Sequence, residues 1–277
     1  MKNYSKPRKI WRAINMPLIY LGIQIAVAII YTFALGIMFV IEQVKGGIEL
    51  TQDEVTNMLT RIITENQHFV LLATGLVGSL VFFLFWNKEK GNLPPKTAKF
   101  TPLNAVLVLM LGLASNIIIG TVIEITRLDE FFSSYAQIEE IIMSGTFAVR
   151  LFGVGILAPI AEELCFRGLM YNRLKGGKMP VIWAMILSSL AFGIIHFNIL
   201  QSMYAFAFGM VIVFVYEKYK SIFAPILIHI AVNTFSVLLM EVTITPIAET
   251  VMFAASILFA VCYAVIAITS RKRAEEV

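Results

Sequence analysis

The chain has 277 residues, of which 58% are hydrophobic and only 14% are charged, and its mean hydropathy is +0.82. Soluble domains carry about 25% charged residues, so this composition excludes an ordinary soluble enzyme and favours a single polytopic bundle of membrane helices. The net charge of +4 comes from cations confined to particular loops, so we expect no nucleic-acid partner.

The first apolar run follows a basic, polar N-terminus. It is too long for the core of a signal peptide and lacks a small-residue cleavage site, so we expect it to be an uncleaved first span. Cys165 and Cys262 both lie in apolar segments. They are expected to be small core residues rather than a disulfide or a metal pair.

A membrane-spanning helix needs roughly 20 predominantly apolar residues. Eight segments are candidates, at residues 16–40, 69–86, 103–125, 147–169, 181–197, 202–216, 223–240 and 251–268. The fifth and sixth are short and closely spaced, which predicts a tight helical hairpin. Residues 42–67 and 128–144 are amphipathic and polar, as expected for short interfacial helices.

The distribution of Lys and Arg tests this count of spans. If the N-terminus is cytoplasmic, the inner segments are 1–15, 87–99, 172–178, 217–220 and 271–277. They hold 17 Lys and Arg residues, whereas the outer segments hold 3. Cytoplasmic loops are enriched in these residues, so the pattern predicts an all-α membrane bundle with about eight spans and both termini cytoplasmic. We expect one membrane domain over residues 1–277. Its expected location is a bacterial cytoplasmic membrane.

Charged residues inside the fourth span need an explanation, because each costs roughly 2.5–3.5 kcal/mol at the centre of a membrane helix. Glu163 and Arg167 are four residues apart and can form an ion pair on one helix face. Glu162 points in another direction and has no partner on its own helix. Pro159, about one turn earlier, loosens the local backbone bonding. An ion-pair cluster near the membrane surface would explain Glu163 and Arg167 but not Glu162.

Two later spans contribute further polar residues. The fifth ends in Phe192-Gly-Ile-Ile-His196, and the seventh contains His229-Ile-Ala-Val-Asn233, whose two polar residues share one face. Taken alone, such residues more often form structural hydrogen bonds between membrane helices than a catalytic site. Their joint occurrence with the paired glutamates is more specific.

The order Glu-Glu-x-x-x-Arg, Phe-x-x-x-His and His-x-x-x-Asn on three membrane helices resembles the CPBP family of CAAX proteases and bacteriocin-processing (Abi-type) proteins. This family includes the type II CAAX prenyl endopeptidases. The resemblance covers roughly residues 147–240, the expected catalytic core. It implies an intramembrane endopeptidase that hydrolyses a membrane-associated protein or a leader peptide.

The residue chemistry agrees with that implication. Glu162 and His196 would activate water, and His229 and Asn233 would aim donors at an oxyanion. Glu163, Arg167 and Phe192 would support them. Glu162, His196 and His229 are possible Zn²⁺ ligands, and the family has been described both as metalloproteases and as metal-independent glutamate proteases. Asn is a poor zinc ligand and no His-Glu-x-x-His motif is present, which slightly favours catalysis without a metal.

Two other classes of function remain. A non-catalytic scaffold or bacteriocin self-immunity protein could keep the protease fold, although it would have no reason to retain an unpaired Glu162. A transporter could use the same residues as a proton relay, but it would be expected to show an internal repeat, and none is evident. The expected spans place Glu162 near the inner membrane surface and His196 near the outer one. Either the fifth span is broken or tilted so that His196 lies deeper, or the site lies near the middle of the bilayer. We expect a water-filled cavity in the middle of the membrane, open on one side.

Overall fold

The structure is a computed structural model that describes residues 6–47, 51–92, 100–143 and 145–275. Across these ranges, every regular element is a helix and there is no strand, which confirms the all-α prediction. Residues 1–5, 93–99 and 276–277, which belong to three of the expected cytoplasmic segments, lie outside the described residues.

Among the described residues, five helices are long and apolar enough to cross a bilayer. They are α1 (Lys6–Lys45), α3 (Gln67–Glu89), α4 (Pro102–Thr126), α11 (Ile199–Tyr219) and α13 (Pro246–Glu275). Two shorter apolar helices, α10 (Val181–Ile194) and α12 (Phe223–Leu239), pack against α11 and α4 respectively. Helices of this length and composition make the chain a multi-pass membrane protein.

The expected fourth span is one continuous rod of five helical segments. These are α7 (Phe147–Arg150), η2 (Leu151–Leu157), α8 (Ala158–Glu163), η3 (Leu164–Tyr171) and α9 (Asn172–Gly176). The segments η2 and η3 are π-helical, and the residues at every junction keep right-handed helical backbone angles. The rod therefore continues past residue 169, the expected end of the span. Its α-helical centre, α8, lies between the two wider π-helical segments η2 and η3.

Short helices occupy the two regions expected to be interfacial. The first contains α2 (Gln52–Glu65), which begins with a capping box between Thr51 and Glu54. The second contains α5 (Leu128–Phe131) and α6 (Ser134–Met143). A single turn, η1 (Lys90–Asn92), follows α3.

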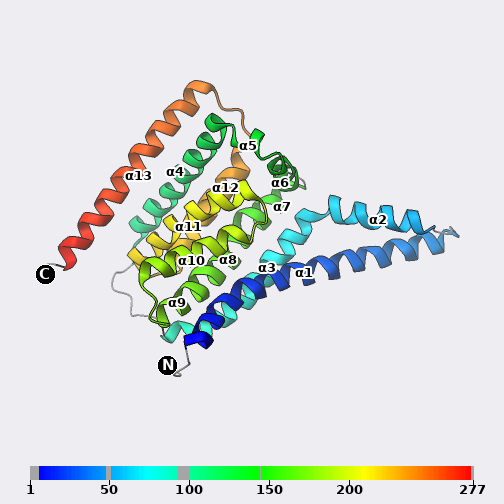
Figure 1. The fold of residues 1–277 in the computed structure, drawn as a ribbon. Helices are drawn as coiled ribbons and strands as arrows, with labels where there is room; N and C mark the ends of the chain where they lie inside the picture. The colour runs from blue at the N-terminus through cyan, green and yellow to red at the C-terminus, as the bar shows by residue number, and fades with distance from the viewer. Residues whose placement is uncertain (1–5, 48–50, 93–99, 144, 276–277) are drawn as a thin grey trace.

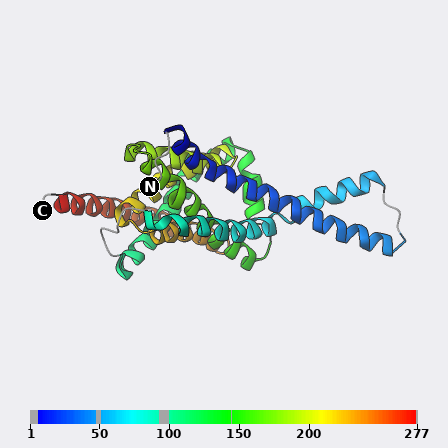
Figure 2. The same ribbon diagram turned by 90° about the horizontal axis from the view of Figure 1, so that it is seen from below.

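Most of the helices run side by side in one bundle, and an arm projects from it (Figure 1). The arm consists of the second half of α1 together with α2, which packs along it, and Figure 2 shows the arm extending beyond the bundle when seen from below. The N-terminal turn of α1, the α9 segment and the last turns of α13 lie toward the same end of the bundle (Figure 1).

Two buried clusters hold the bundle together. One joins α1, α3, the central rod, α10 and α11 around Phe166 and Tyr171, and the other joins α4, α11, α12 and α13 around Ile212 and Ile228. Cys165 is buried in the first cluster as expected, whereas Cys262 is exposed on α13, so the expectation that both are core residues is wrong for Cys262.

The hairpin of α10 and α11 differs from its expected boundaries. The first helix ends at Ile194 instead of residue 197, and the second begins at Ile199 instead of residue 202. The side chain of Asn198 caps the second helix by accepting a hydrogen bond from the backbone N–H of Gln201 at 3.1 Å. The helices approach so closely that a Cβ at Gly193 would lie 2.6 Å from the carbonyl oxygen of Ser202. Glycine is therefore required there.

Candidate active site

A buried ionic cluster lies at the junction of α8 and η3. Arg167 donates from Nη1 to Oε1 of Glu163 at 2.8 Å, and neither side chain is exposed. The same Oε1 accepts a second hydrogen bond, also at 2.8 Å, from Nδ1 of His229 on α12. The predicted pairing of Glu163 with Arg167 is confirmed, and Glu163 also holds a histidine from another helix.

The guanidinium of Arg167 has two further contacts. Its Nη2 donates to the carbonyl oxygen of Gly209 on α11 at 3.1 Å, and its Cζ lies 4.5 Å from the ring centroid of Phe192 on α10. A Cβ at residue 209 would lie 3.1 Å from Nη2, so the glycine leaves the space that lets the guanidinium approach the backbone. Arg167 therefore links the rod to two neighbouring helices.

Glu162 points into a different environment from Glu163. Its Oε1 accepts a hydrogen bond from the hydroxyl of Tyr20 on α1 at 3.2 Å, and its Oε2 lies 3.6 Å from Nε2 of His229. The Glu162 side chain is 12% exposed, whereas that of Glu163 is fully buried. Glu162 is thus the more accessible of the two carboxylates, and one of its oxygens faces an imidazole at a distance too long for a direct hydrogen bond.

The tautomer of His229 follows from its partners. A carboxylate oxygen only accepts, so Nδ1 carries the hydrogen that is donated to Glu163, and in the neutral ring Nε2 has a free lone pair toward Glu162. The rings of Phe192 and Phe208 pack edge-on against His229, with centroids 5.4 and 5.6 Å away. The imidazole is therefore fixed both by a hydrogen bond and by two aromatic walls.

His196 follows α10 in a turn. Its Nδ1 is 2.8 Å from the carbonyl oxygen of Phe192, which can only accept, so Nδ1 is again the protonated nitrogen in the neutral ring. The two rings lie edge to face, with centroids 5.2 Å apart. Glu162 lies within electrostatic range of the His196 imidazole, although the two make no direct hydrogen bond.

The contacts of α10 bring the two sides of the site to the same level of the bundle. Phe192 lies against Phe166 at 5.3 Å and against the Arg167 guanidinium, so it is level with the ionic cluster. His196 lies one turn beyond Phe192. The difference in depth between the expected spans came from ending the fourth span at residue 169, because the rod continues to Gly176 and Glu162 lies near its middle.

Asn233, one turn after His229, contacts the π-helical segment η2. Its Nδ2 donates to the carbonyl oxygen of Val154 at 3.0 Å. In a π-helix this carbonyl would pair with the N–H five residues later, as Gly153 does with Ala158, but residue 159 is proline and has no N–H. Asn233 therefore supplies the hydrogen bond that Pro159 cannot.

Neighbouring carbonyls of η2 are bonded in the same way. Gly155 accepts from the hydroxyl of Thr234 at 3.3 Å, and Leu157 accepts from that of Ser79 on α3 at 3.1 Å. Side chains from adjacent helices commonly satisfy backbone groups freed near a proline in a membrane helix. The wide turn before the glutamates is thus bonded to α12 and α3.

The structure brings Glu162, Glu163, Arg167, Phe192 and His229 into one cluster, with His196 at its edge. Asn233 lies on the same face of α12, but its amide is engaged with the backbone of η2. Sequence reasoning missed Tyr20. A tyrosine within an apolar span gives no signal by itself, since its contact with Glu162 joins residues 142 positions apart.

Glu162, His196 and His229 carry the donor atoms that a metal ion at this site would need. Both histidines hold a hydrogen on Nδ1 and leave Nε2 free, which is the arrangement of many metal-ligating histidines. Among the described residues, however, no three His, Cys, Asp or Glu side chains converge closely enough to hold one ion. The side chains in this arrangement do not form a ready three-ligand site.

Comparison with known families gives one match. Residues 144–235 match the family described as "Type II CAAX prenyl endopeptidase Rce1-like". This segment contains all three motifs and every residue of the cluster. Tyr20, which donates to Glu162, lies outside it. No solved structure matches the chain at a significant level.

Three bacterial proteins are similar to parts of the chain. The "Putative membrane peptidase YdiL" of Bacillus subtilis is 34% identical over 84 residues, covering 30% of this chain and 34% of the relative. The "Membrane-embedded CAAX protease MroQ" of Staphylococcus aureus is 31% identical over 103 residues, covering 35% and 42%. The "UPF0177 protein YxdF" of Lactococcus lactis is 24% identical over 165 residues, covering 58% and 89%. The first two matches thus span less than half of each relative.

Proposed function

We propose that the chain is an intramembrane endopeptidase, because residues 144–235, which hold the three motifs, match the Rce1-like family of type II CAAX prenyl endopeptidases. The observation that carries the proposal is the position of Glu162. Its carboxylate is the more accessible one of the pair, with Oε1 held by Tyr20 and Oε2 left facing His229.

In the proposed reaction, Oε2 of Glu162 removes a proton from a water molecule as that water attacks the scissile carbonyl. A general base must lie within hydrogen-bonding reach of the proton that it takes. A water that contacts both Oε2 of Glu162 and Nε2 of His229, which lie 3.6 Å apart, would meet this requirement. The hydrogen bond from Tyr20 orients the carboxylate so that Oε2 is the oxygen available for the reaction.

The other residues of the cluster hold the catalytic groups in position or stabilise the charge that develops during the reaction. Glu163 and Arg167 fix the rod and the imidazole of His229, and His196 presents a free Nε2 that can share the water. The proton that Glu162 takes from water passes to Nε2 of His229, which then donates a hydrogen bond to the oxyanion, with the second N–H of the Asn233 amide as a further donor. The same proton goes to the nitrogen of the leaving amine as the peptide bond breaks. No step in this proposal passes through a metal, in keeping with the slight preference for metal-free catalysis that the sequence motifs gave.

The substrate class is a peptide or membrane protein presented within the lipid bilayer. Leader peptides, membrane-anchored regulators and peptides that confer self-immunity fit a bacterial membrane enzyme better than prenylated proteins, because bacteria mostly lack prenylated substrates. The names of the relatives support a bacterial membrane peptidase and no particular cleavage sequence.

We also infer eight membrane crossings with both termini in the cytoplasm. The five long helices, the two shorter apolar helices α10 and α12, and the rod of residues 147–176 together make eight. The excess of Lys and Arg at alternate connections sets the orientation. Reporter fusions after residues 92, 176 and 220 should report the cytoplasm, and fusions after residues 47, 130 and 243 the opposite side.

The test of the proposed activity compares the membrane peptidome of cells that carry the unmodified chain, Glu162→Gln or His196→Ala. Peptides that depend on the chain should disappear with both variants, while thermal unfolding shows that both are folded. Unchanged peptides in both variants would overturn the protease proposal. A phenotype that survives Glu162→Gln but not deletion would favour a scaffold. Repeating the cleavage with a chelator tests for a metal, and lost activity that Zn²⁺ restores would overturn the metal-free mechanism.

A further inference from the structure

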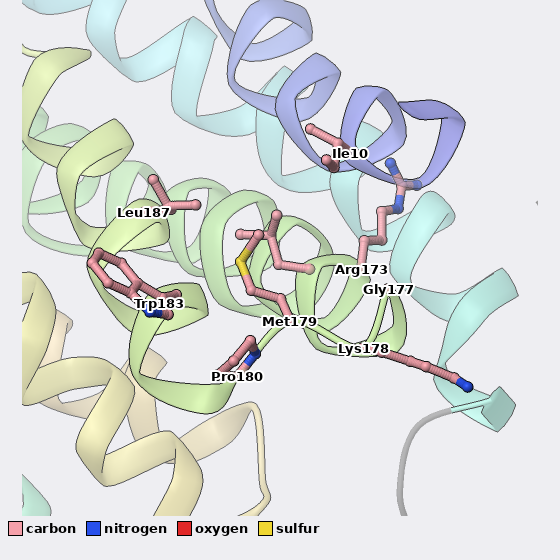
Figure 3. Close-up of a pocket in the computed structure, with 9 residues that line it drawn as sticks. Ile10, Arg173, Gly177, Lys178, Met179, Pro180, Trp183 and Leu187 are labelled. Atoms are coloured by element: carbon pink, nitrogen blue, oxygen red, sulfur yellow. The ribbon is translucent and has the colours of Figure 1, made fainter. Parts of the chain in front are cut away.

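A second contact joins α1 to the rod, at the end of the bundle where α1 begins. Arg173 of α9 donates from Nη1 to the backbone carbonyl oxygen of Arg12 on α1 at 2.5 Å. Its Nη2 and Nε donate to Oε1 and Oε2 of Glu89, the last residue of α3, at 2.9 and 3.1 Å. Figure 3 shows the Arg173 side chain extending from α9 toward the first turns of α1, near Ile10. One guanidinium therefore connects the rod to two other helices.

Arg173 is suited to this position by its shape as well as its charge. Its side chain is only 13% exposed, and it binds one carboxylate through two N–H groups while a third nitrogen reaches α1. Lysine has a single ammonium group and cannot reproduce this planar fork. Glu89 also accepts a hydrogen bond from Nη2 of Arg12 at 3.0 Å, so the carboxylate keeps a partner when Arg173 is replaced.

Arg173 and Glu162 contact α1 at two separate levels. On the rod they are eleven residues apart, and their partners on α1, Arg12 and Tyr20, are eight residues apart. At a rise of about 1.5 Å per residue, the two partners are separated by roughly 12 Å along α1. Two directional contacts at this separation determine how far α1 is displaced along the rod and which of its faces meets the site.

The apolar packing of α1 on the rod does not determine that register by itself. Ala13 and Met16 of α1 belong to the same buried cluster as Cys165 of the rod. Apolar burial is non-directional, so it tolerates a small displacement of one helix along another. The hydrogen bond from Tyr20 to Glu162 is less tolerant, because at 3.2 Å it is already long for a hydroxyl donor. A small displacement of α1 would therefore break it.

We propose that Arg173 is a positioning residue for the peptidase reaction. By fixing the register of α1 on the rod, it places the Tyr20 hydroxyl on Oε1 of Glu162 and so leaves Oε2 to take the proton from water. This inference rests on the proposed function, because the base that Arg173 helps to orient belongs to that reaction. An ion pair that only stabilised the fold would affect catalysis equally with and without the Tyr20 hydroxyl.

The first test is a double-mutant cycle on kcat, measured with the full chain in lipid vesicles and a peptide substrate taken from the membrane peptidome. Arg173→Gln should lower kcat by roughly tenfold, the loss expected when the hydrogen bond from Tyr20 to Glu162 is broken, and should change KM little. In a Tyr20→Phe background, Arg173→Gln should change kcat by less than about twofold, because the hydrogen bond through which it acts is already absent. Equal losses in the two backgrounds would overturn the proposal.

Two further variants separate the position of Arg173 from its charge. Arg173→Lys keeps a cation beside Glu89 but lacks the fork that also reaches α1, so kcat should fall nearly as far as in Arg173→Gln. Full activity in Arg173→Lys would contradict the proposal. Lys175→Gln is the matched control, because this lysine lies on the same segment but pairs with Glu217 of α11 at 2.7 Å, and it should leave kcat unchanged. A loss equal to that of Arg173→Gln would mean that the effect does not pass through α1 and would refute the proposal.

A thiol reports how firmly α1 is held, without any catalysis. Cys165 is fully buried in the same cluster as Tyr20, and Cys262→Ser leaves it as the only thiol of the chain. Arg173→Gln should raise the rate of Cys165 alkylation by N-ethylmaleimide roughly tenfold, because α1 opens more often, whereas Lys175→Gln should not. Unchanged alkylation in Arg173→Gln would overturn this inference. Raised alkylation in a chain that cleaves no peptide would overturn the proposed function while confirming that Arg173 sets the position of α1.

Discussion

Asn233 donates its amide to the carbonyl oxygen of Val154, the carbonyl in η2 whose π-helical partner would be the nitrogen of Pro159. The third sequence motif is therefore bonded directly to the wide turn that precedes the two glutamates. A hydrogen-bond role for Asn233 and an oxyanion role make different predictions, and the proline allows the two to be separated.

Asn233→Ala should lower the free energy of unfolding by about 1–3 kcal/mol, because it leaves the partly buried carbonyl of Val154 without a donor. In a Pro159→Ala background, residue 159 regains an N–H, so the same substitution should cost at least about 1 kcal/mol less. Thermal or denaturant unfolding of the four proteins in detergent measures this double-mutant cycle. Strictly additive losses would contradict the relationship between the two residues.

Cleavage by the same four proteins tests the oxyanion role separately. If Asn233 also stabilises an oxyanion, activity should stay low in the Pro159→Ala, Asn233→Ala double variant even where stability recovers. Recovery of both would assign Asn233 to the backbone of η2 alone.

Removal of one partner from the buried ionic cluster should be costly. Glu163→Gln leaves the guanidinium of Arg167 buried without its carboxylate, and breaking such a pair costs about 3–5 kcal/mol. Arg167→Met in the Glu163→Gln background removes the unpaired charge and should restore part of the lost stability. Unfolding measurements that find the double variant less stable than Glu163→Gln would show that Arg167 is stabilised mainly by Gly209 and Phe192.

Tyr20→Phe should impair catalysis while it preserves packing. The ring keeps its edge contacts with Phe82 and Phe166, whose centroids are 5.8 and 6.5 Å away, but Oε1 of Glu162 loses its donor. A hydrogen bond to a charged group contributes about 1.5–3 kcal/mol, so kcat should fall by roughly tenfold or more.

Tyr31→Phe, on the same helix but stacked on Phe69, is the matched control and should retain full activity. Equal kcat values for Tyr20→Phe and the unmodified chain would remove Tyr20 from the proposed mechanism.

The stability of the first turn of α2 should depend on pH. The backbone and hydroxyl hydrogen bonds from Thr51 hold the pKa of Glu54 below its usual value of 4.5. A lowered folded-state pKa means that the cap stabilises α2 fully above the ordinary carboxylate pKa, and that this contribution is lost as pH falls through the folded-state pKa. Amide hydrogen exchange in the first turn should therefore show more opening at acidic pH, after correction for intrinsic exchange rates. Glu54→Gln should remove most of that pH dependence.

Much of the helical fold could be predicted from local pattern. Each of the eight apolar runs coincides with a helix or with the rod, and the spacing of four between Glu163 and Arg167 predicted their ion pair, which the structure confirms. The early end of α10 also had a local signal that was overlooked, since Asn198 is a preferred residue for the start of a helix.

Contacts between distant segments carried no such signal. The hydrogen bond from Tyr20 to Glu162 depends on how α1 packs against the rod. The π-helical segment η2 is bonded by donors from α3 and α12, and the α12 donor, Asn233, replaces the N–H missing from Pro159. Proline alone predicts a weakened helix, but it does not predict which neighbouring side chains will repair it.

The length of α1 has a consequence for the site that its N-terminal half helps to form. At about 1.5 Å per residue, its 40 residues extend roughly 60 Å, about twice the thickness of a bilayer's hydrocarbon core. A helix so much longer than the bilayer responds to membrane thickness by changing its tilt. Because Tyr20 belongs to this helix and donates to Glu162, we expect a change in the thickness of the surrounding membrane to alter the orientation of the proposed base.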